Sequence, residues 1–109
     1  MTQDSNAERS GEITVVVDPE IKDIIPIFLD NRRGDVTTVL EALDQSDYES
    51  IRILGHSLQG AGGGYGFHAI TALGESLNEA AKERNAEGIR KLVGELSSYL
   101  DRVNVVYDE

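Results

Sequence analysis

Apolar residues recur at spacings of three and four along four stretches of the chain, a period typical of helices that bury one face. The clearest stripe belongs to the last stretch, which follows Asn85: Ile89, Leu92, Val93, Leu96, Tyr99, Leu100 and Val103. The other three stretches cover residues 23–43, 46–64 and 67–84. The pattern therefore predicts four amphipathic helices joined by connections of a few residues.

The first of these helices follows a strong start signal, Asp18-Pro19-Glu20, which predicts a short turn or helix near residues 18–22. Pro26 fits the first turn of the long helix, where proline is tolerated, and the glycine within residues 31–34 leaves open a break there. Apart from Arg32, the stripe of this helix is apolar. Its members are Ile25, Phe28, Leu29, Arg32, Val36, Val39, Leu40 and Leu43.

Local signals also bound the later helices. Ser46 and Glu49 have the spacing of a capping box, which predicts that the second helix begins at Ser46. The glycine run before Phe67 ends that helix, and Gly66 is free to take a left-handed conformation. Asn85 is expected to cap the last helix.

The N-terminal residues lack the helical period. Residues 1–11 are polar and predict a disordered arm. Residues 13–17 are β-branched but too short and isolated to predict a sheet, so we expect them to lie extended along the helices. The chain is thus divided into a flexible or extended arm, 1–17, and a helical domain, 18–109.

Short connections between amphipathic helices favour antiparallel neighbours. The predicted fold is all-α, an antiparallel up-down-up-down four-helix bundle with an extended N-terminal arm and a short leading turn or helix. Bundles of this kind support many unrelated activities, so the function has to come from particular residues.

Composition narrows the classes of partner. The formal net charge of −10 argues against nucleic acid and anionic membranes, both of which select clustered Lys and Arg. The sequence has no cysteine and no apolar run of about 20 residues, the length that crosses a bilayer. We therefore expect a soluble, cytoplasmic protein, and we expect it to be a monomer.

His56 is the candidate for chemistry. On a helical wheel with about 100° per residue it falls about 140° from Ile51 and opposite the apolar cluster of the second helix, so its side chain should face solvent. His68 begins the next helix without surrounding glycines, and we interpret it as a surface residue. The two histidines lack the Glu-x-x-His pairs of di-iron bundles, so no metal site is predicted.

Glycines surround His56 and destabilise the helix that contains them, because each glycine in a helix interior lowers helix stability by about 0.8–1 kcal/mol relative to alanine. Gly55 and Gly62 fall toward the core, where a closely packed neighbouring helix would require them. Gly60 and Gly63 fall on the outward face instead. Their expected benefit is room for another protein to approach the imidazole.

The segment His56-Ser57-Leu58-Gln59-Gly60, with the small residues and the apolar helix that follow it, resembles the histidine-containing phosphotransfer (HPt) domain family. The family pattern is His-x-Leu-Lys-Gly, so the resemblance assigns His56 as the phosphorylated histidine and matches Gly60 to the glycine one turn later. Gln59 stands where the family has lysine, which offsets phosphate charge. Arg52, one turn before His56, could supply that charge instead.

The resemblance implies a phosphorelay intermediate. An exposed, neutral imidazole can attack phosphorus and hold the phosphoryl group as a labile phosphoramidate. The sequence has no glycine-rich ATP loop, so we expect no enzyme activity and no cofactor of its own. The partner would be a response-regulator receiver domain, which supplies the aspartate and Mg²⁺, a hybrid histidine kinase, or both. Ile53, apolar and outward-facing, is the predicted docking residue beside Gly60 and Gly63.

An alternative function stays open at this point. The chain could be a non-catalytic module that docks receiver domains without phosphotransfer, because Gln59 replaces the usual lysine. Transfer of label from a phosphorylated receiver distinguishes the two functions.

Overall fold

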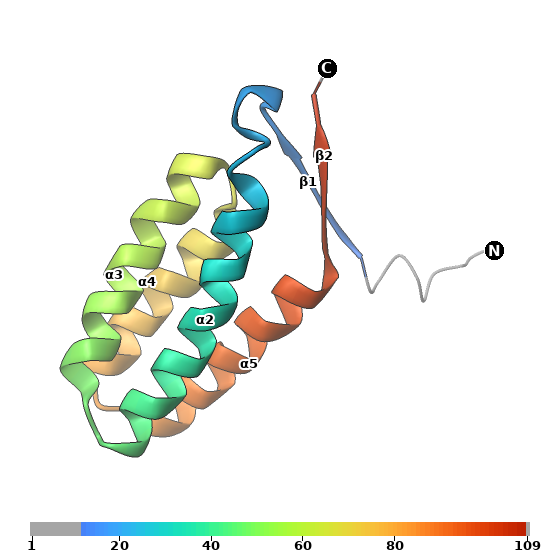
Figure 1. Cartoon of the computed structure of the whole chain (residues 1–109). Coiled ribbons are helices and arrows are strands. Elements are labelled where there is room, and N and C mark those ends of the chain that lie inside the picture. The colour runs from blue at the N-terminus through green and yellow to red at the C-terminus, as the bar shows by residue number, and fades with distance from the viewer. Residues whose placement is uncertain (1–11, 109) are drawn as a thin grey trace.

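Four helices make up most of the computed structural model, which describes residues 12–108 (Figure 1). They are α2 (Ile25–Asp44), α3 (Tyr48–Tyr65), α4 (His68–Lys82) and α5 (Ala86–Arg102). Figure 1 shows that the short connections between them lie at alternating ends of a bundle. The prediction of a four-helix bundle is therefore confirmed. None of the helices in the described part of the chain is long and apolar enough to span a membrane.

The start of the first long helix follows the predicted signals. Asp18 accepts a hydrogen bond from the backbone N–H of Glu20 (2.9 Å) and caps a single 3-10 turn, η1 (Pro19–Ile21). Pro26 lies in the first turn of α2, where its missing N–H breaks no helical hydrogen bond. The alternative break at residues 31–34 is wrong, because α2 is continuous through Gly34.

The predicted cap of α3 is wrong by one residue. Asp47, rather than Ser46, is the N-cap, and its carboxylate accepts hydrogen bonds from the backbone N–H (3.2 Å) and hydroxyl (2.7 Å) of Ser50. These bonds lower the pKa of Asp47, with the hydroxyl contributing most. Ser46 instead takes a left-handed conformation with φ of 55°, which turns the chain from α2 into α3.

The other predicted caps are confirmed. Gly66 ends α3 in the left-handed conformation, with φ of 87°, which glycine adopts without steric cost. Asn85 caps α5 by accepting a hydrogen bond from the backbone N–H of Gly88 (3.0 Å).

A two-stranded parallel sheet corrects the predictions for both ends of the chain. β1 (Ile13–Val17) pairs with β2 (Val103–Tyr107), with Ile13 opposite Val103 and Val17 opposite Tyr107. The N-terminal segment is extended, as predicted, but the expectation that it forms no sheet is wrong, because it pairs with β2. Val103, predicted to continue the last helix, is the first residue of β2. Residues 1–11, the rest of the predicted arm, lie outside the described residues, and the division at residue 18 stays a prediction.

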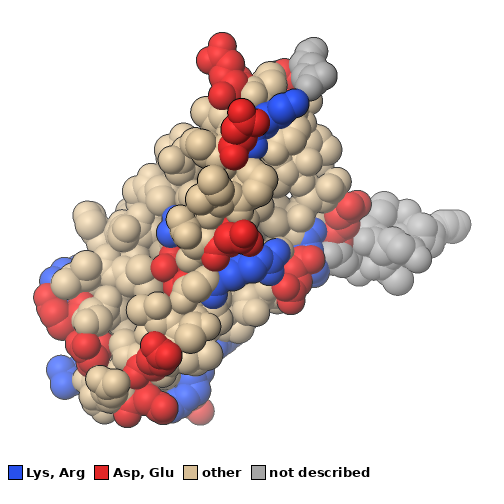
Figure 2. Space-filling view, viewed as in Figure 1, with Lys and Arg blue, Asp and Glu red and all other residues tan. Residues whose placement is uncertain are grey.

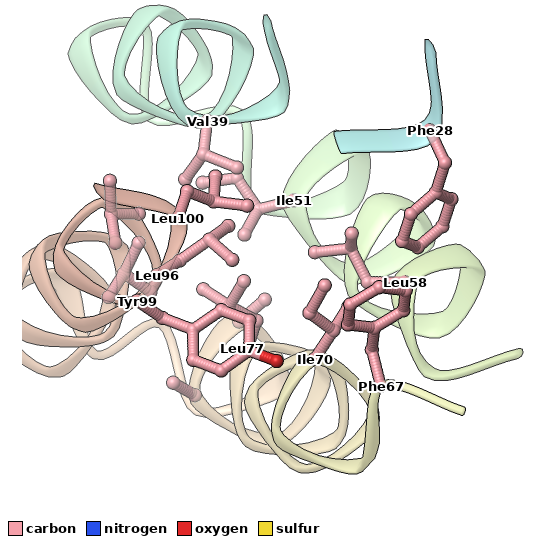
Figure 3. Close-up of a cluster of buried hydrophobic side chains, with 14 of the residues drawn as sticks. Phe28, Val39, Ile51, Leu58, Phe67, Ile70, Leu77, Leu96, Tyr99 and Leu100 are labelled. Atoms are coloured by element: carbon pink, nitrogen blue, oxygen red, sulfur yellow. The ribbon is translucent and has the colours of Figure 1, made fainter. Parts of the chain in front are cut away.

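The core lies between the four helices, and each helix contributes to it (Figure 3). The largest fully buried side chains are Phe67, Ile25, Ile51, Leu58, Ile70, Leu77, Ile89, Leu96 and Val39. Phe28 stacks on Phe67 with ring centroids 5.3 Å apart, which joins the start of α2 to the start of α4. One member of the predicted stripe does not follow it: Leu40 is 45% exposed.

Candidate functional site

His56 lies near the middle of α3, and its side chain is exposed. The buried residues of α3 all lie on the other side of the helix: Ile51, Gly55, Leu58 and Gly62. Because residues three and four apart share a face, burying this set turns His56 outward. Its predicted exposure is confirmed.

The inward glycines of α3 allow close contact with α4, as predicted. A Cβ added at Gly55 would lie 2.7 Å from the backbone nitrogen of Asn78, and one at Gly62 would lie 2.6 Å from that of Thr71. Gly74 of α4 completes the contact, since a Cβ there would lie 2.5 Å from the backbone nitrogen of Gln59. Gly74 was missed, although it lies on the same buried stripe as Ile70 and Leu77.

The outward glycines have different surroundings. A Cβ at Gly60 or Gly64 would meet nothing within 4 Å, whereas one at Gly63 would lie 3.6 Å from the Thr71 hydroxyl oxygen, an ordinary contact distance. Gly60 therefore leaves open space one turn after His56. Gly63 is also exposed but borders α4.

The Arg52 guanidinium lies toward the first turn of α3. Its Nη2 is 2.6 Å from Glu49 Oε2 and its Nε is 3.1 Å from Glu49 Oε1, so the pair is bidentate. The hydrogen bonds and charge of Arg52 lower the pKa of the Glu49 carboxyl. The i,i+3 spacing of Glu49 and Arg52 is a local sequence signal for this pair.

Gln59 is half-buried beside α4. Its backbone carbonyl accepts a hydrogen bond of 3.1 Å from the Thr71 hydroxyl. At the other side of His56, the Asn78 amide donates a hydrogen bond of the same length to the backbone carbonyl of Arg52. Neither Thr71 nor Asn78 was a candidate from sequence, because no local pattern shows which side chains of α4 face α3.

Ile53, the predicted docking residue, is 55% exposed on α3. With His56, Gly60 and Gly63 it forms part of an exposed, uncharged face of this helix. Figure 2 shows mostly uncharged residues over the upper left of the molecule, where the C-terminal half of α3 lies in Figure 1, whereas charged residues gather at the lower end of the bundle and also lie at the top and centre of the view. A protein partner can therefore approach this half of α3 without desolvating many charges.

The second histidine has different surroundings. His68 is exposed at the first position of α4, as predicted for a surface residue, and belongs to a different helix from His56. Within residues 12–108, no group of three or more His, Asp or Glu side chains is placed to hold a metal ion.

Comparisons with known proteins bear on this arrangement. The profile of one protein family, the Hpt domain, matches residues 23–105, a range that includes all four helices and His56. Comparisons with curated proteins and with solved structures gave no match.

Hpt domains are helical bundles that serve as phosphocarriers in histidine phosphotransfer, and they interact with response-regulator receiver domains and kinases. Their bundle agrees with the four helices seen here. Because the match covers most of the chain, the protein belongs to the Hpt domain family.

Proposed function

We propose that His56 accepts and donates a phosphoryl group, exchanging it with the aspartate of a response-regulator receiver domain in two-component signalling. One observation carries the proposal. In a chain of the Hpt family, His56 is exposed on the outward face of α3, and Gly60 leaves open space one turn later. A bulky side chain at Gly60 would stand where the partner must approach.

The proposed step is a direct exchange. The unprotonated ring nitrogen of His56 attacks the phosphorus of the aspartyl phosphate, and the N–P bond forms as the P–O bond to the carboxylate breaks. The aspartate leaves as a carboxylate anion, and the proton on the other imidazole nitrogen is released to solvent. The reverse step returns the group to a receiver.

The neighbours of His56 have supporting roles in this proposal. Gln59 donates a hydrogen bond to a phosphoryl oxygen, and Arg52 supplies positive charge when it leaves Glu49. Ile53 buries apolar area against the receiver, while Gly60 and Gly63 admit its backbone. Ile53 and the two glycines account for a face that is both apolar and open, and Gln59 and Arg52 lie beside it.

The wider setting follows from the same proposal. The helices run in up-down-up-down order, which leaves one face of α3 free, and the protein works as a cytoplasmic monomer. The chain has no ATP site of its own, and the Mg²⁺ that assists transfer is held by the receiver. The phosphoryl donor is a receiver domain, alone or within a hybrid histidine kinase.

Incubation with a phosphorylated receiver tests the proposal. The wild-type chain should gain a label that is labile in acid and stable in base, and His56→Gln should gain none. His68→Gln is the matched control and should be labelled at the wild-type rate. Label that persists in His56→Gln would place the phosphoryl group elsewhere and refute the assignment.

A second function is favoured by two observations at the same site. Gln59 replaces the family's lysine, and Arg52 is held by Glu49 rather than beside His56. Both reduce the positive charge available to a phosphoryl group. A docking module without transfer would bind receivers through Ile53 but gain no label, and this result would replace the first function with the second.

A further inference from the structure

Two side chains of α4 donate hydrogen bonds to backbone carbonyls of α3. The Thr71 hydroxyl donates to the carbonyl of Gln59, and the Asn78 amide donates to the carbonyl of Arg52, each at 3.1 Å. Both connect residues distant in sequence, unlike the hydrogen bond of Thr38, which donates to Gly34 within its own helix.

The two carbonyls lie on either side of His56. In an α-helix the carbonyl of Arg52 accepts the backbone N–H of His56, and the carbonyl of Gln59 accepts that of Gly63. A carbonyl oxygen has two lone pairs, so each can accept the helical bond and the bond from α4 together. The segment that carries His56 is thus held at both of its ends.

This segment is poorly suited to remain helical by itself. Gly55 lies within it and the other four glycines of α3 follow it at residues 60–64, and glycine loses more backbone entropy in a helix than any other residue. Asn78 is 9% exposed, and the bond to Arg52 satisfies an amide that would otherwise be costly to bury. Gly55 and Gly62 bring the backbones close enough for both side chains to reach α3.

We propose that Thr71 and Asn78 are positioning residues for His56. They hold the segment of α3 that carries His56, and the start of the glycine run after it, in helical geometry, so that the imidazole stays on the outward face and the outward glycines stay open. The effect on phosphotransfer rests on the function proposed above, whereas the effect on the backbone does not. The two can therefore be measured separately.

Amide hydrogen exchange of the full chain measures the backbone effect. Thr71→Val keeps nearly the same shape but removes the donor, and it should speed exchange of the Gly63 amide about 3- to 10-fold, the range expected for one hydrogen bond. Thr71→Ser keeps the donor and should restore the wild-type rate. Thr38→Val removes a threonine hydroxyl-to-carbonyl bond that stays within α2, and it should leave the exchange rate of the Gly63 amide unchanged.

Asn78 is tested in the same way on the amide of His56. Asn78→Ala should speed its exchange by a similar factor, and Asn78→Gln, which keeps an amide donor, should restore part of the protection. Urea unfolding of each variant separates this local change from a loss of global stability. Unchanged exchange in both Thr71→Val and Asn78→Ala would overturn the proposal.

Phosphotransfer from a labelled receiver measures the functional effect. Thr71→Val should slow labelling of His56 several-fold, and Thr71→Ser should not. Faster exchange with an unchanged labelling rate would overturn the positioning role. If the wild type itself gains no label while exchange responds as expected, the phosphotransfer function fails and the hold on the backbone stands.

Discussion

The two faces of α3 carry glycine for opposite physical reasons. On the inner face, Gly55 and Gly62 lie against backbone atoms of α4, so that any side chain would collide with atoms that cannot easily move. On the outer face, a Cβ added at Gly60 or Gly64 would meet no other side chain or neighbouring element within 4 Å. The same residue type therefore stabilises the bundle on one face and only weakens the helix on the other. Because the outer glycines lower helix stability without improving packing, we infer that they serve the function of this face.

The largest expected effect comes from filling the inner face. Gly55→Ala should lower the free energy of unfolding by about 2–3 kcal/mol, because its Cβ would overlap backbone atoms of Asn78 and Gly74. Gly94→Ala is the matched control in α5, where a Cβ meets nothing within 4 Å, and it should raise that free energy by about 0.5–1 kcal/mol. Urea unfolding followed by circular dichroism measures both, and equal changes in the two variants would remove the distinction.

The next largest effect is expected at Gly60 on the outer face, where one substitution should stabilise the fold but slow phosphotransfer. Gly60→Leu should raise the free energy of unfolding by about 0.5–1 kcal/mol, since leucine favours helix and a Cβ at this position meets nothing within 4 Å. Labelling by a phosphorylated receiver should slow about tenfold, a change in activation free energy of about 1.4 kcal/mol. At Gly64 a Cβ also meets nothing within 4 Å, but this position lies a further turn from His56, so Gly64→Leu should slow labelling less. A Gly60→Leu protein that is labelled at the wild-type rate would show that the open space has no role.

The helices could be predicted because their signals are local. The period of apolar residues and the requirement for glycine at Gly66 both act within a few residues of the chain. The cap of α3 was misplaced because Ser46 and Asp47 are both good capping residues, and the turn from α2 decides between them. The sheet was missed because β1 pairs with a strand at the other end of the chain. Val103, moreover, continues the helical stripe as well as it begins β2.

For the site, too, local signals could be read from the sequence and contacts between helices could not. Periodicity alone placed His56 outward and Gly55 and Gly62 inward. Thr71 and Asn78 were out of reach, because their bonds depend on the rotation of α4 relative to α3, which no spacing in the sequence specifies. Gly74 is intermediate: the apolar stripe of α4 puts it on the buried face, and only the structure shows that backbone atoms lie against it.

The smallest expected effect is on the lifetime of phosphohistidine, and it depends on positive charge near His56. Gln59 is uncharged, and the Arg52 guanidinium is paired with Glu49. Gln59→Lys should lengthen the lifetime of phosphohistidine about two- to fivefold, because a cation one turn from His56 offsets the phosphoryl charge in an exposed site. Glu49→Gln should lengthen it less, since it frees Arg52 without fixing its position.

Glu79→Gln breaks the exposed pair with Lys82 in α4 and is the matched control. Decay of the acid-labile label on purified protein gives the three lifetimes. If Glu49→Gln has the larger effect, Arg52 is the main support of the phosphoryl group; if none of the three differs from wild type, the partner supplies that support.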